Sequence, residues 1–507
     1  MYSSISLELK IIPEMDIFNQ LGKNAENYSD EDIIKAIIAG SQTGRDLTDT
    51  LSSGPSLKPE SLDPVVKVLE NKESHIQLWK LLPKQSVYNT VHEYNLLTSY
   101  GADVGIFMNE GESPEQTDSI YRRKAALVKY AGIQGELTQQ AMLVRQADGK
   151  DPYTREVENK TLKLLTQLDT KLVTSNSSLV SQEFNGIKKQ HYDGICEING
   201  SVNLDVYMND VSNIDVRGKA LKDANVEDAS HAVINDRFGD VSKIISNPVV
   251  FNDYVKRFHE SKRIMVNNPT SGTEGATMGQ KVNTIMTQFG PTDVTQDIFF
   301  DRRVAKAYNA ASTNAKAPAT PTLVNNTCLV IVSADTKTKF TDSAGSYFYA
   351  VSAINQYGES ALQICNTTTK AIGTTESLDI TFAAGVGTYA ATAYRIYRTE
   401  KNAANYTTAK FYPIIEVTSA EFTTGYDGAT GGVVRDRNRT LPNTHIALVM
   451  DPNTEMWEYI QLAATMKIDF AITTLARRFA VVNYGTPVLY MPGKIAVIHN
   501  IGRDLTA

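Results

Sequence analysis

The chain contains few cysteines and no long apolar run, and each shortage argues against a class of protein. Its three cysteines, Cys196, Cys328 and Cys365, are too few and too scattered for the disulfide framework of a small secreted domain. We expect reduced, buried thiols, because a free cysteine usually behaves as a small apolar residue. Cys328 and Cys365 fall in one segment and could instead pair. No apolar stretch approaches the ~18 residues of a membrane-spanning helix, so we expect no membrane contact.

Targeting signals and positive charge are also scarce. The N-terminal residues, MYSSISLELKIIPEM, lack a basic segment followed by an apolar one, so no signal peptide is predicted. The net charge of −7 argues against tight, sequence-independent binding of DNA, which needs a basic face. We therefore expect a soluble protein that is made in a cytoplasm.

Motifs that carry catalysis are absent or interrupted. Gly385–Ala390 matches the dinucleotide pattern G-x-G-x-x-A, but strand-like sequence follows it instead of the helix that would hold a pyrophosphate. Gly272–Lys281 resembles a phosphate loop that Gln280 interrupts. His191, Asp193 and Cys196 cluster in HYDGIC, so a Cys–His nucleophile is conceivable, but no second acidic or amide residue stands out to orient it, and a polar turn is the favoured interpretation. We predict no catalytic residues, no cofactor and no metal site, and hence a protein that is not an enzyme.

The most informative feature present is a long polar hairpin. Ser86–Tyr100 and Tyr121–Ala131 both alternate as strands do, yet neither has a fully apolar face. A hairpin that cannot bury itself is only marginally stable alone. We expect this one to lie on a neighbouring copy of the same chain.

Charge divides the hairpin into an acidic tip, within Gly101–Ile120, and a basic returning limb. Solvated charge is the plain interpretation, since exposed ion pairs contribute little. The alternative is that the tip docks on a basic patch of an adjacent subunit. The candidate intersubunit residues are Asp103, Glu110, Glu112, Glu115, Arg122, Arg123 and Lys124.

An amphipathic helix and mixed sequence follow the hairpin. Asp151 and Pro152 are typical of an N-cap and a first helical position, and the apolar spacing predicts about 25 helical residues, ~37 Å, long enough to cross a sheet. Further on, 202–208 reads as a strand, 243–246 reads as a short buried strand, and the segments 225–237 and 248–260 read as helices.

Residues 315–438 have a different character. They lose helical periodicity and become rich in Thr, Ala, Tyr and Gly. Short strands separated by turn-forming residues are typical of a small antiparallel sandwich. The expected strands are 328–333, 347–354, 377–382, 394–398 and 411–417.

Read in order, these segments resemble the major capsid protein of tailed double-stranded DNA bacteriophages, which has the HK97-like fold. The resemblance rests on GPSLKPESLDPVVKVL and QLWKLLPK within 54–84, on the hairpin, on the helix 151–173, on 225–258 and on the C-terminal FAVVNYGTPVLYMPGKIAVIHNIG (479–502). YFYAVSAINQYGES (347–360) and AYRIYRTE (393–400) are similar to strands of an immunoglobulin or fibronectin-type-III module. Such a module would be an insertion into the shell fold.

The resemblance implies an α+β fold class, namely an HK97-like capsid fold with an inserted all-β sandwich. The implied parts are an N-terminal arm with helices (1–84), an E-loop hairpin (85–145), a P-domain with a spine helix (146–215, continued by 479–507), a first part of the A-domain (216–314), an Ig/FnIII-like β-sandwich (315–438), a second part of the A-domain (439–478) and the C-terminal P-domain strands (479–507).

The implied function is that of a major capsid protein. Copies would form hexamers and pentamers of an icosahedral shell around packaged dsDNA, which is contacted non-specifically. The implied partners are the chain itself and the portal, scaffold and decoration proteins. The implied location is the virion capsid, assembled in the host bacterial cytoplasm. Three other interpretations stay open: an encapsulin-like cage, a surface or adhesion protein that binds through its β-module, and an enzyme with an accessory sandwich.

Overall fold

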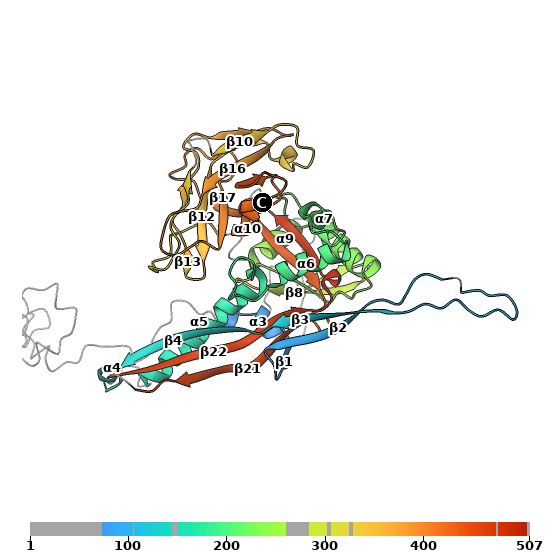
Figure 1. Ribbon diagram of the computed structural model, residues 1–507, viewed down its shortest axis with the longest axis horizontal. Coiled ribbons are helices and arrows are strands. Elements are labelled where there is room, and N and C mark those ends of the chain that lie inside the picture. Colours follow the sequence, from blue (N-terminus) through green and yellow to red (C-terminus); the bar gives the residue numbers. More distant parts are fainter. Residues whose placement is uncertain are drawn as a thin grey trace, which may run out of the picture. The chain divides into compact units, whose positions relative to one another are not determined.

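The computed structural model describes residues 73–104, 106–143, 151–259, 283–301, 306–323, 328–472 and 475–503. All of them belong to one compact unit of the chain. The N-terminal residues 1–72 and the loop 272–281 lie outside the described residues. Within the described part, helices and strands are mixed, so the expected α+β class is confirmed (Figure 1).

A four-stranded sheet carries the long helix. Its order is β1 (Lys84–Ser86), β21 (Trp457–Asp469), β22 (Ala476–Leu489) and β4 (Lys129–Thr138). The helix α5 (Pro152–Thr174) lies along β4 and β22, as predicted, and buries Leu164, Leu168 and Leu172. It begins where Asp151 accepts hydrogen bonds from the backbone N–H groups of Tyr153 and Thr154, which have no partner inside the helix.

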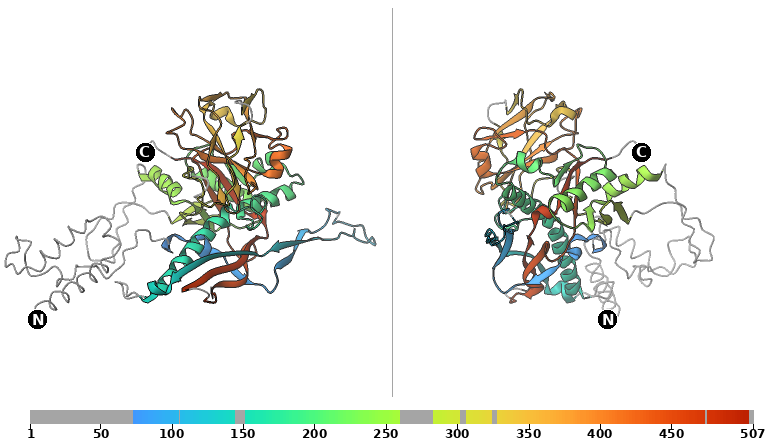
Figure 2. Two further views of the ribbon diagram at one scale, coloured as in Figure 1. Left: turned by 60° about the vertical axis from the view of Figure 1, so that its left-hand side comes forward. Right: turned by 90° about the vertical axis from the view of Figure 1, so that its right-hand side faces the viewer.

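The predicted hairpin is present. It consists of β2 (Val91–Ser99) and β3 (Ile120–Leu127), which pair with each other and, among the described strands, with no third strand. Figures 1 and 2 show it leaving the four-stranded sheet. The returning limb is interrupted at the buried Val128 and continues as β4. The foot of the arm, where β3 continues as β4, is therefore anchored in the four-stranded sheet, and the outer part of the arm is free of it.

A second sheet has six strands, in the order β5 (Asn213–Asp215), β23 (Ala496–Ile501), β20 (His445–Met450), β6 (Lys243–Ser246), β8 (Gly290–Gln296) and β7 (Thr284–Thr287). The helices α8 (Asp223–His231) and α9 (Pro248–His259) pack on it, and the π-helical segment η3 (Ala232–Asp236) extends α8. The predicted strand 243–246 and the two flanking helices are confirmed.

Two expectations differ from the structure. The segment 202–208, expected as a strand, contains the short helix α7 (Leu204–Met208), because the side chain of Asn203 caps it by accepting the N–H of Asp205. The division at residue 479 cuts through β22, while β23 joins the six-stranded sheet and not the four-stranded one. The division was misplaced because strand pairing is non-local and the apolar strands from 445 to 501 are similar in sequence, so the sequence does not show which sheet each strand joins.

The insert is antiparallel, with two larger sheets and a separate pair of short strands packed around one core. Every expected strand is present: β10 (Leu329–Val332), β12 (Tyr349–Asn355), β16 (Ser377–Ala383), β17 (Ala393–Arg398) and β18 (Tyr412–Thr418). Shorter strands complete it, namely β9 (Thr322–Leu323), β11 (Gly345–Tyr347), β13 (Gly358–Glu359), β14 (Gln363–Ile364), β15 (Lys370–Ile372) and β19 (Val433–Asp436). One sheet is ordered β10-β16-β19 and the other β13-β12-β17-β18. We call residues 322–438 the sandwich; its kinship to immunoglobulin or fibronectin-type-III modules stays a prediction.

The remaining helical segments are short, except for α6. They are η2 (Glu73–His75), α3 (Leu78–Leu81), α4 (Gln139–Leu143), α6 (Ile187–Ile198), η4 (Phe340–Asp342), α10 (Ser419–Thr424) and η5 (Pro492–Lys494). All three cysteines are free and buried, as expected, and the thiol of Cys328 donates to the carbonyl oxygen of Cys365. Among the helices of the described residues, none has the length and apolar character needed to cross a bilayer.

Candidate assembly interface

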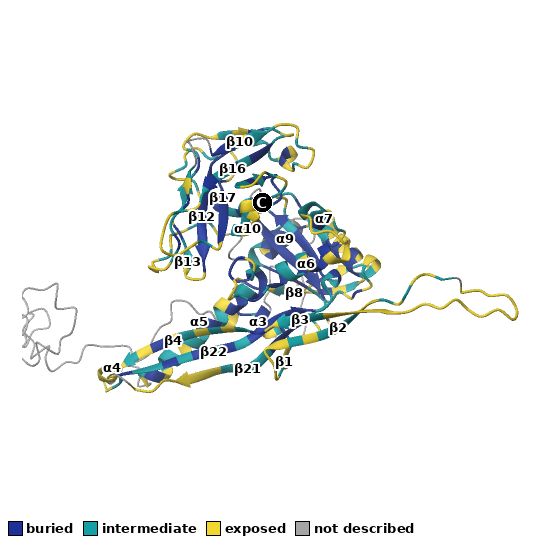
Figure 3. Cartoon of the chain, viewed as in Figure 1, coloured by how far each residue is buried: buried dark blue, intermediate teal, exposed yellow. Residues whose placement is uncertain are grey.

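The outer part of the hairpin exposes apolar as well as charged side chains. Its tip, residues 100–104 and 106–119, has no regular secondary structure apart from one turn, and it is exposed along almost its whole length (Figure 3). Ile106, Phe107 and Met108 stand in this tip, and the side chain of Phe107 is 93% exposed. An exposed apolar cluster of this kind marks an interaction surface. The acids of the tip were predicted as contact residues, whereas these three apolar residues were not, although they are adjacent in sequence.

The four predicted acidic residues, Asp103, Glu110, Glu112 and Glu115, are all exposed in the same tip. Glu112 accepts hydrogen bonds from the backbone and the side chain of Asn109, which closes a local turn. The structure therefore brings the acids together with the apolar cluster at the end of the arm. Their contact with a neighbouring copy stays a prediction.

The three predicted basic residues lie at the other end of the arm and have partners in the same chain. Arg122 and Lys124 both form ion pairs with Glu197 of α6, and Arg123 lies 3.5 Å from Glu93 across the hairpin. The hydrogen bond from Lys124 is the main reason that the pKa of Glu197 is below its usual value. These contacts give the basic limb a role in positioning the arm on its own subunit. Their contact with a neighbour is likewise untested.

The base of the arm also rests on aromatic residues. Tyr94 of β2 packs edge-on against Tyr490, with 4.8 Å between the ring centroids, and Tyr490 donates a hydrogen bond to Glu458. A cavity of about 290 Å³ lies beside this contact and is lined by Lys124, Glu197 and the end of β22. The arm is thus held by a few polar and aromatic contacts beside a cavity, and not by a close-packed core.

The four-stranded sheet has one covered face and one open face. Phe479 and Val481 turn toward α5 and are buried, so the alternating residues Ala480 and Val482 turn to the other side. In register with them stand Ile468 and Met466, both exposed by more than a third. The open face is therefore largely apolar.

The open face continues at both ends of the sheet. Near the foot of the arm, Tyr130 of β4 is 61% exposed and packs edge-on against Tyr484. At the far end, Phe470, Ile472 and Leu475 are exposed around the connection between β21 and β22. Neither end was identified from the sequence, because the open face is defined only once α5 has covered the opposite one.

The far end of the open face carries an ion pair. Arg478 alternates with Ala480 and pairs with Glu136 of β4 on that face. Lys467 and Arg477 lie on the opposite side of the sheet, over the ring of Tyr153 of α5. Both of them pair with Asp469. The open face is therefore apolar with the Arg478–Glu136 pair at this end.

The comparisons with known proteins give distant structural likenesses. No family model matches the chain, and no curated protein matches it. The capsid of a native GTA particle is similar at 8% identity and a TM-score of 0.42, over 90% of this chain and 99% of that one. The capsid of the cyanophage P-SCSP1u is similar at 9% identity and a TM-score of 0.40, over 89% and 95%.

A third similar structure is an encapsulin complex from Synechococcus elongatus PCC 7942. Its identity is 8% and its TM-score 0.36, over 87% of this chain and 93% of that one. Most of the chain is thus similar, at low scores, to the chains of two capsids and of an encapsulin complex.

Proposed function

We propose that the chain is a shell-forming structural protein, the major capsid protein of a tailed phage. Copies assemble into hexamers and pentamers of an icosahedral virion shell through their hairpin arms. The observation that supports the proposal most is the arm itself: two strands that pair only with each other in the described chain and end in exposed apolar residues. The proposed role is structural and not enzymatic.

The physical reason is that the arm lacks a core of its own. An isolated two-stranded hairpin is marginally stable, whereas one that lies on another surface is not. The nine residues of β2 span ~30 Å at about 3.3 Å per residue, before the tip begins. An arm of this length crosses from one subunit to the next in a closed assembly. Contacts of this heterologous kind close rings when the rotation between subunits permits.

The proposed receptor of the tip is the far end of the open face on a neighbouring copy. Ile106, Phe107 and Met108 supply three apolar side chains, and Met466 and Ile468 offer an apolar counterpart. Burying each of the three is worth about 1.5–3 kcal/mol. The acids of the tip would stand near Arg478, the cation that lies on the open face beside Ala480.

The charge of the chain suits a wall around packaged dsDNA. A net charge of −7 keeps non-specific attraction to DNA weak, so the shell encloses the packaged DNA without binding it tightly. The proposed partners beyond the chain itself are portal, scaffold and decoration proteins. Assembly in the host bacterial cytoplasm is part of the same proposal.

Electron microscopy of the purified protein tests the proposal, with Phe107→Asp as the informative variant. The wild type is expected to form closed shells or hexameric rings, and the variant is expected to stay as subunits, because burying an unpaired carboxylate is unfavourable. Val386→Asp is the matched control, since Val386 is 98% exposed on the sandwich and away from the arm. A wild type that stays monomeric would contradict the proposal. Nuclease-protected DNA inside shells isolated from a native source would separate a capsid from an encapsulin-like cage.

A further inference from the structure

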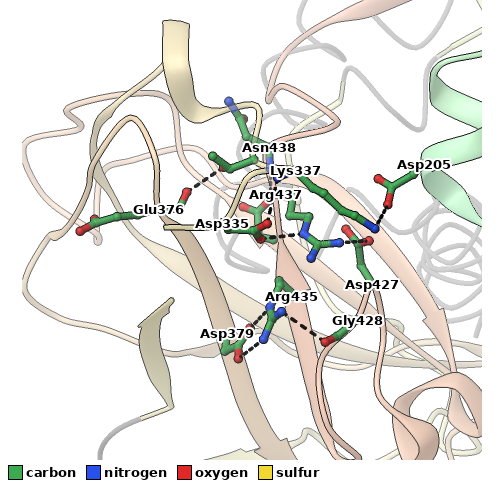
Figure 4. A network of polar contacts seen from close by, with 12 residues as sticks. Asp205, Asp335, Lys337, Glu376, Asp379, Asp427, Gly428, Arg435, Arg437 and Asn438 are labelled. Carbon is green, nitrogen blue, oxygen red and sulfur yellow. Dashed lines mark hydrogen bonds and ion pairs between the residues drawn. The ribbon is translucent and has the colours of Figure 1, made fainter. Parts of the chain in front are cut away.

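The sandwich contacts the rest of the chain largely through charged groups, and one carboxylate binds two cations. Asp205 of α7 lies 2.8 Å from Nζ of Lys337, which belongs to the sandwich (Figure 4). It also accepts a hydrogen bond from Arg439. Arg439 stands in the segment that leaves the sandwich. Burial alone would raise the pKa of Asp205, but the hydrogen bonds from Lys337 and Arg439 hold it below the usual value. Asp205 is therefore ionised and shared between two cations at neutral pH.

A second polar contact supports the first. Arg217, in the loop after β5, donates hydrogen bonds to the carbonyl oxygens of Lys339 and Asn438. Both carbonyls belong to segments at the same end of the sandwich. Arg217 has a left-handed backbone conformation, with φ +52°, which is uncommon outside glycine. The main body therefore contacts the sandwich through one anion, Asp205, and one cation, Arg217.

The contact between Asp205 and Arg439 lies at the end of a ladder of ion pairs inside the sandwich. In the sequence RDRNR (435–439), alternate residues turn to opposite sides of the strand and its continuation. The three arginines find carboxylates in succession: Arg435 binds Asp379, Arg437 binds Asp335 and Asp427, and Arg439 binds Asp427 and Asp205. Arg439 is thus the one arginine of the three whose partners belong to both the sandwich and the main body.

The apolar contact between the sandwich and the main body is small by comparison. One cluster joins them, in which Leu179 and Val180 meet Ile354 and Ala393. Beside it, a cavity of about 330 Å³ separates β18 from the ends of α5, α6 and α7. Close packing fixes the relative orientation of two parts, and a cavity between them removes such packing contacts. The ionic contacts therefore carry much of the orientation of the sandwich.

We propose that Asp205 is an ionic latch that holds the sandwich in one orientation, and that the sandwich turns relative to the main body when the latch opens. Salt opens it, because Lys337 is half-exposed and its pairing is screened by ions. The ladder inside the sandwich persists, because Arg437 and its two partners are buried. The latch is independent of whether the chain builds a shell.

Single-molecule energy transfer on the full chain tests the latch. Fluorophores are attached at Val386→Cys on the sandwich and Asn159→Cys on α5, two exposed positions, while the three native cysteines are buried and stay unlabelled. The wild type is expected to show one narrow distance distribution at low salt. Asp205→Asn is expected to raise the ratio of turned to latched molecules about tenfold, because two charge-assisted hydrogen bonds are weakened. Raising the salt to ~1 M should move the wild type toward the variant, since screening shortens to about 3 Å.

Two further variants serve as controls for this experiment. Asp193→Asn removes a carboxylate that pairs with Lys189 on α6, outside the latch, and should leave the distribution unchanged. Lys337→Met removes one cation from the half-exposed side and should give an intermediate ratio. If Asp205→Asn keeps the wild-type distribution with a folded sandwich, the latch is refuted. If Asp205→Asn does not fold, an unchanged ratio in Lys337→Met refutes it equally.

Discussion

The most demanding prediction concerns two buried carboxyl groups that hold the segment leading into the arm. Asp169 of α5 accepts the backbone N–H of Trp79 at 2.7 Å, and Asp297, just after β8, accepts the N–H groups of Leu78 and Phe299 at 2.9 and 2.8 Å. Both side chains are fully buried. Together they fasten α3 to the long helix and to the six-stranded sheet.

The second oxygen of Asp169 has no N–H or O–H donor among the described residues. Its neighbour is the carboxylate of Asp297, so the two groups share a hydrogen bond only if one of them carries a proton. Burial, and next to it the charge of Asp297, raises the pKa of Asp169 to about 9. Asp169 is therefore protonated at neutral pH in the folded chain and ionised in the unfolded one.

Folding must then take up a proton, and the sign of the pH dependence follows. The pKa of Asp169 is higher in the folded chain than in the unfolded one. Its contribution to the free energy of unfolding is therefore fully present below the unfolded pKa of 3.8, and it is lost progressively as the pH rises toward 9. One proton corresponds to ~1.4 kcal/mol per pH unit. Between the unfolded pKa and pH 7 the loss has an upper bound of about 4 kcal/mol, and coupling to Asp297 makes about 2 kcal/mol the working figure.

Asp169→Asn removes the titration and keeps both contacts, because its amide accepts from Trp79 and donates to Asp297. At pH 7 the variant is expected to be more stable than the wild type by about 2 kcal/mol, and the difference is expected to vanish below the unfolded pKa of 3.8. Urea unfolding of the subunit at several pH values measures this. Fluorescence of the two tryptophans is a suitable signal, since Trp79 and Trp457 are both buried.

Asp228→Asn, at an exposed position on α8, is the matched control and should not change the pH slope. A wild type and an Asp169→Asn variant with the same slope between pH 5 and 8 would refute the protonated pair. A variant that is less stable at every pH would show that Asp169 is ionised in the folded chain.

Three further predictions test other parts of the structure. Glu197→Gln weakens the two ion pairs at the base of the arm, so hydrogen exchange of the β2 and β3 amides should accelerate while the midpoint of urea unfolding stays nearly unchanged, because these pairs are partly exposed. Gly135→Ala places a methyl group about 2.4 Å from the ring of Phe479, so it should destabilise the subunit by about 1–3 kcal/mol in urea unfolding. Asp436→Asn deprives the fully buried Arg398 of its carboxylate, and the sandwich should lose about 3–5 kcal/mol, seen as a lower melting temperature of the sandwich transition.

Local patterns predicted the elements of this fold well. The cap formed by Asp151, the turn residues of the insert and the alternation of the hairpin are each visible within a few consecutive residues, because the forces that act there are local. The five expected strands of the insert lie within one or two residues of the observed ones. The helix α7 was not predicted, since a single capping side chain outweighed the alternation of 202–208.

The partners of those elements could not be predicted in the same way. Glu197 contacts Arg122 across 75 residues and Asp297 contacts Leu78 across 219, and no periodicity in the sequence joins such positions. The ladder of Arg435, Arg437 and Arg439 did have a signal, since arginines at every second position predict one charged face. What the sequence lacked was the position of the aspartates that receive them.

The contacts around the insertion explain how the fold accommodates a whole sandwich. Asp301 and His445 lie on either side of the insert, 144 residues apart, and Nδ1 of His445 is 2.5 Å from the carboxylate of Asp301 in a buried position. Asn247 donates to the same carboxylate from the end of β6. The main body thus closes across the point of insertion with its own hydrogen bonds. The closure entropy of a loop grows only slowly with its length, so a sandwich between two ends that already meet adds little to it. A latch formed by a few charged groups is then sufficient to orient a module whose attachment the main body has already secured.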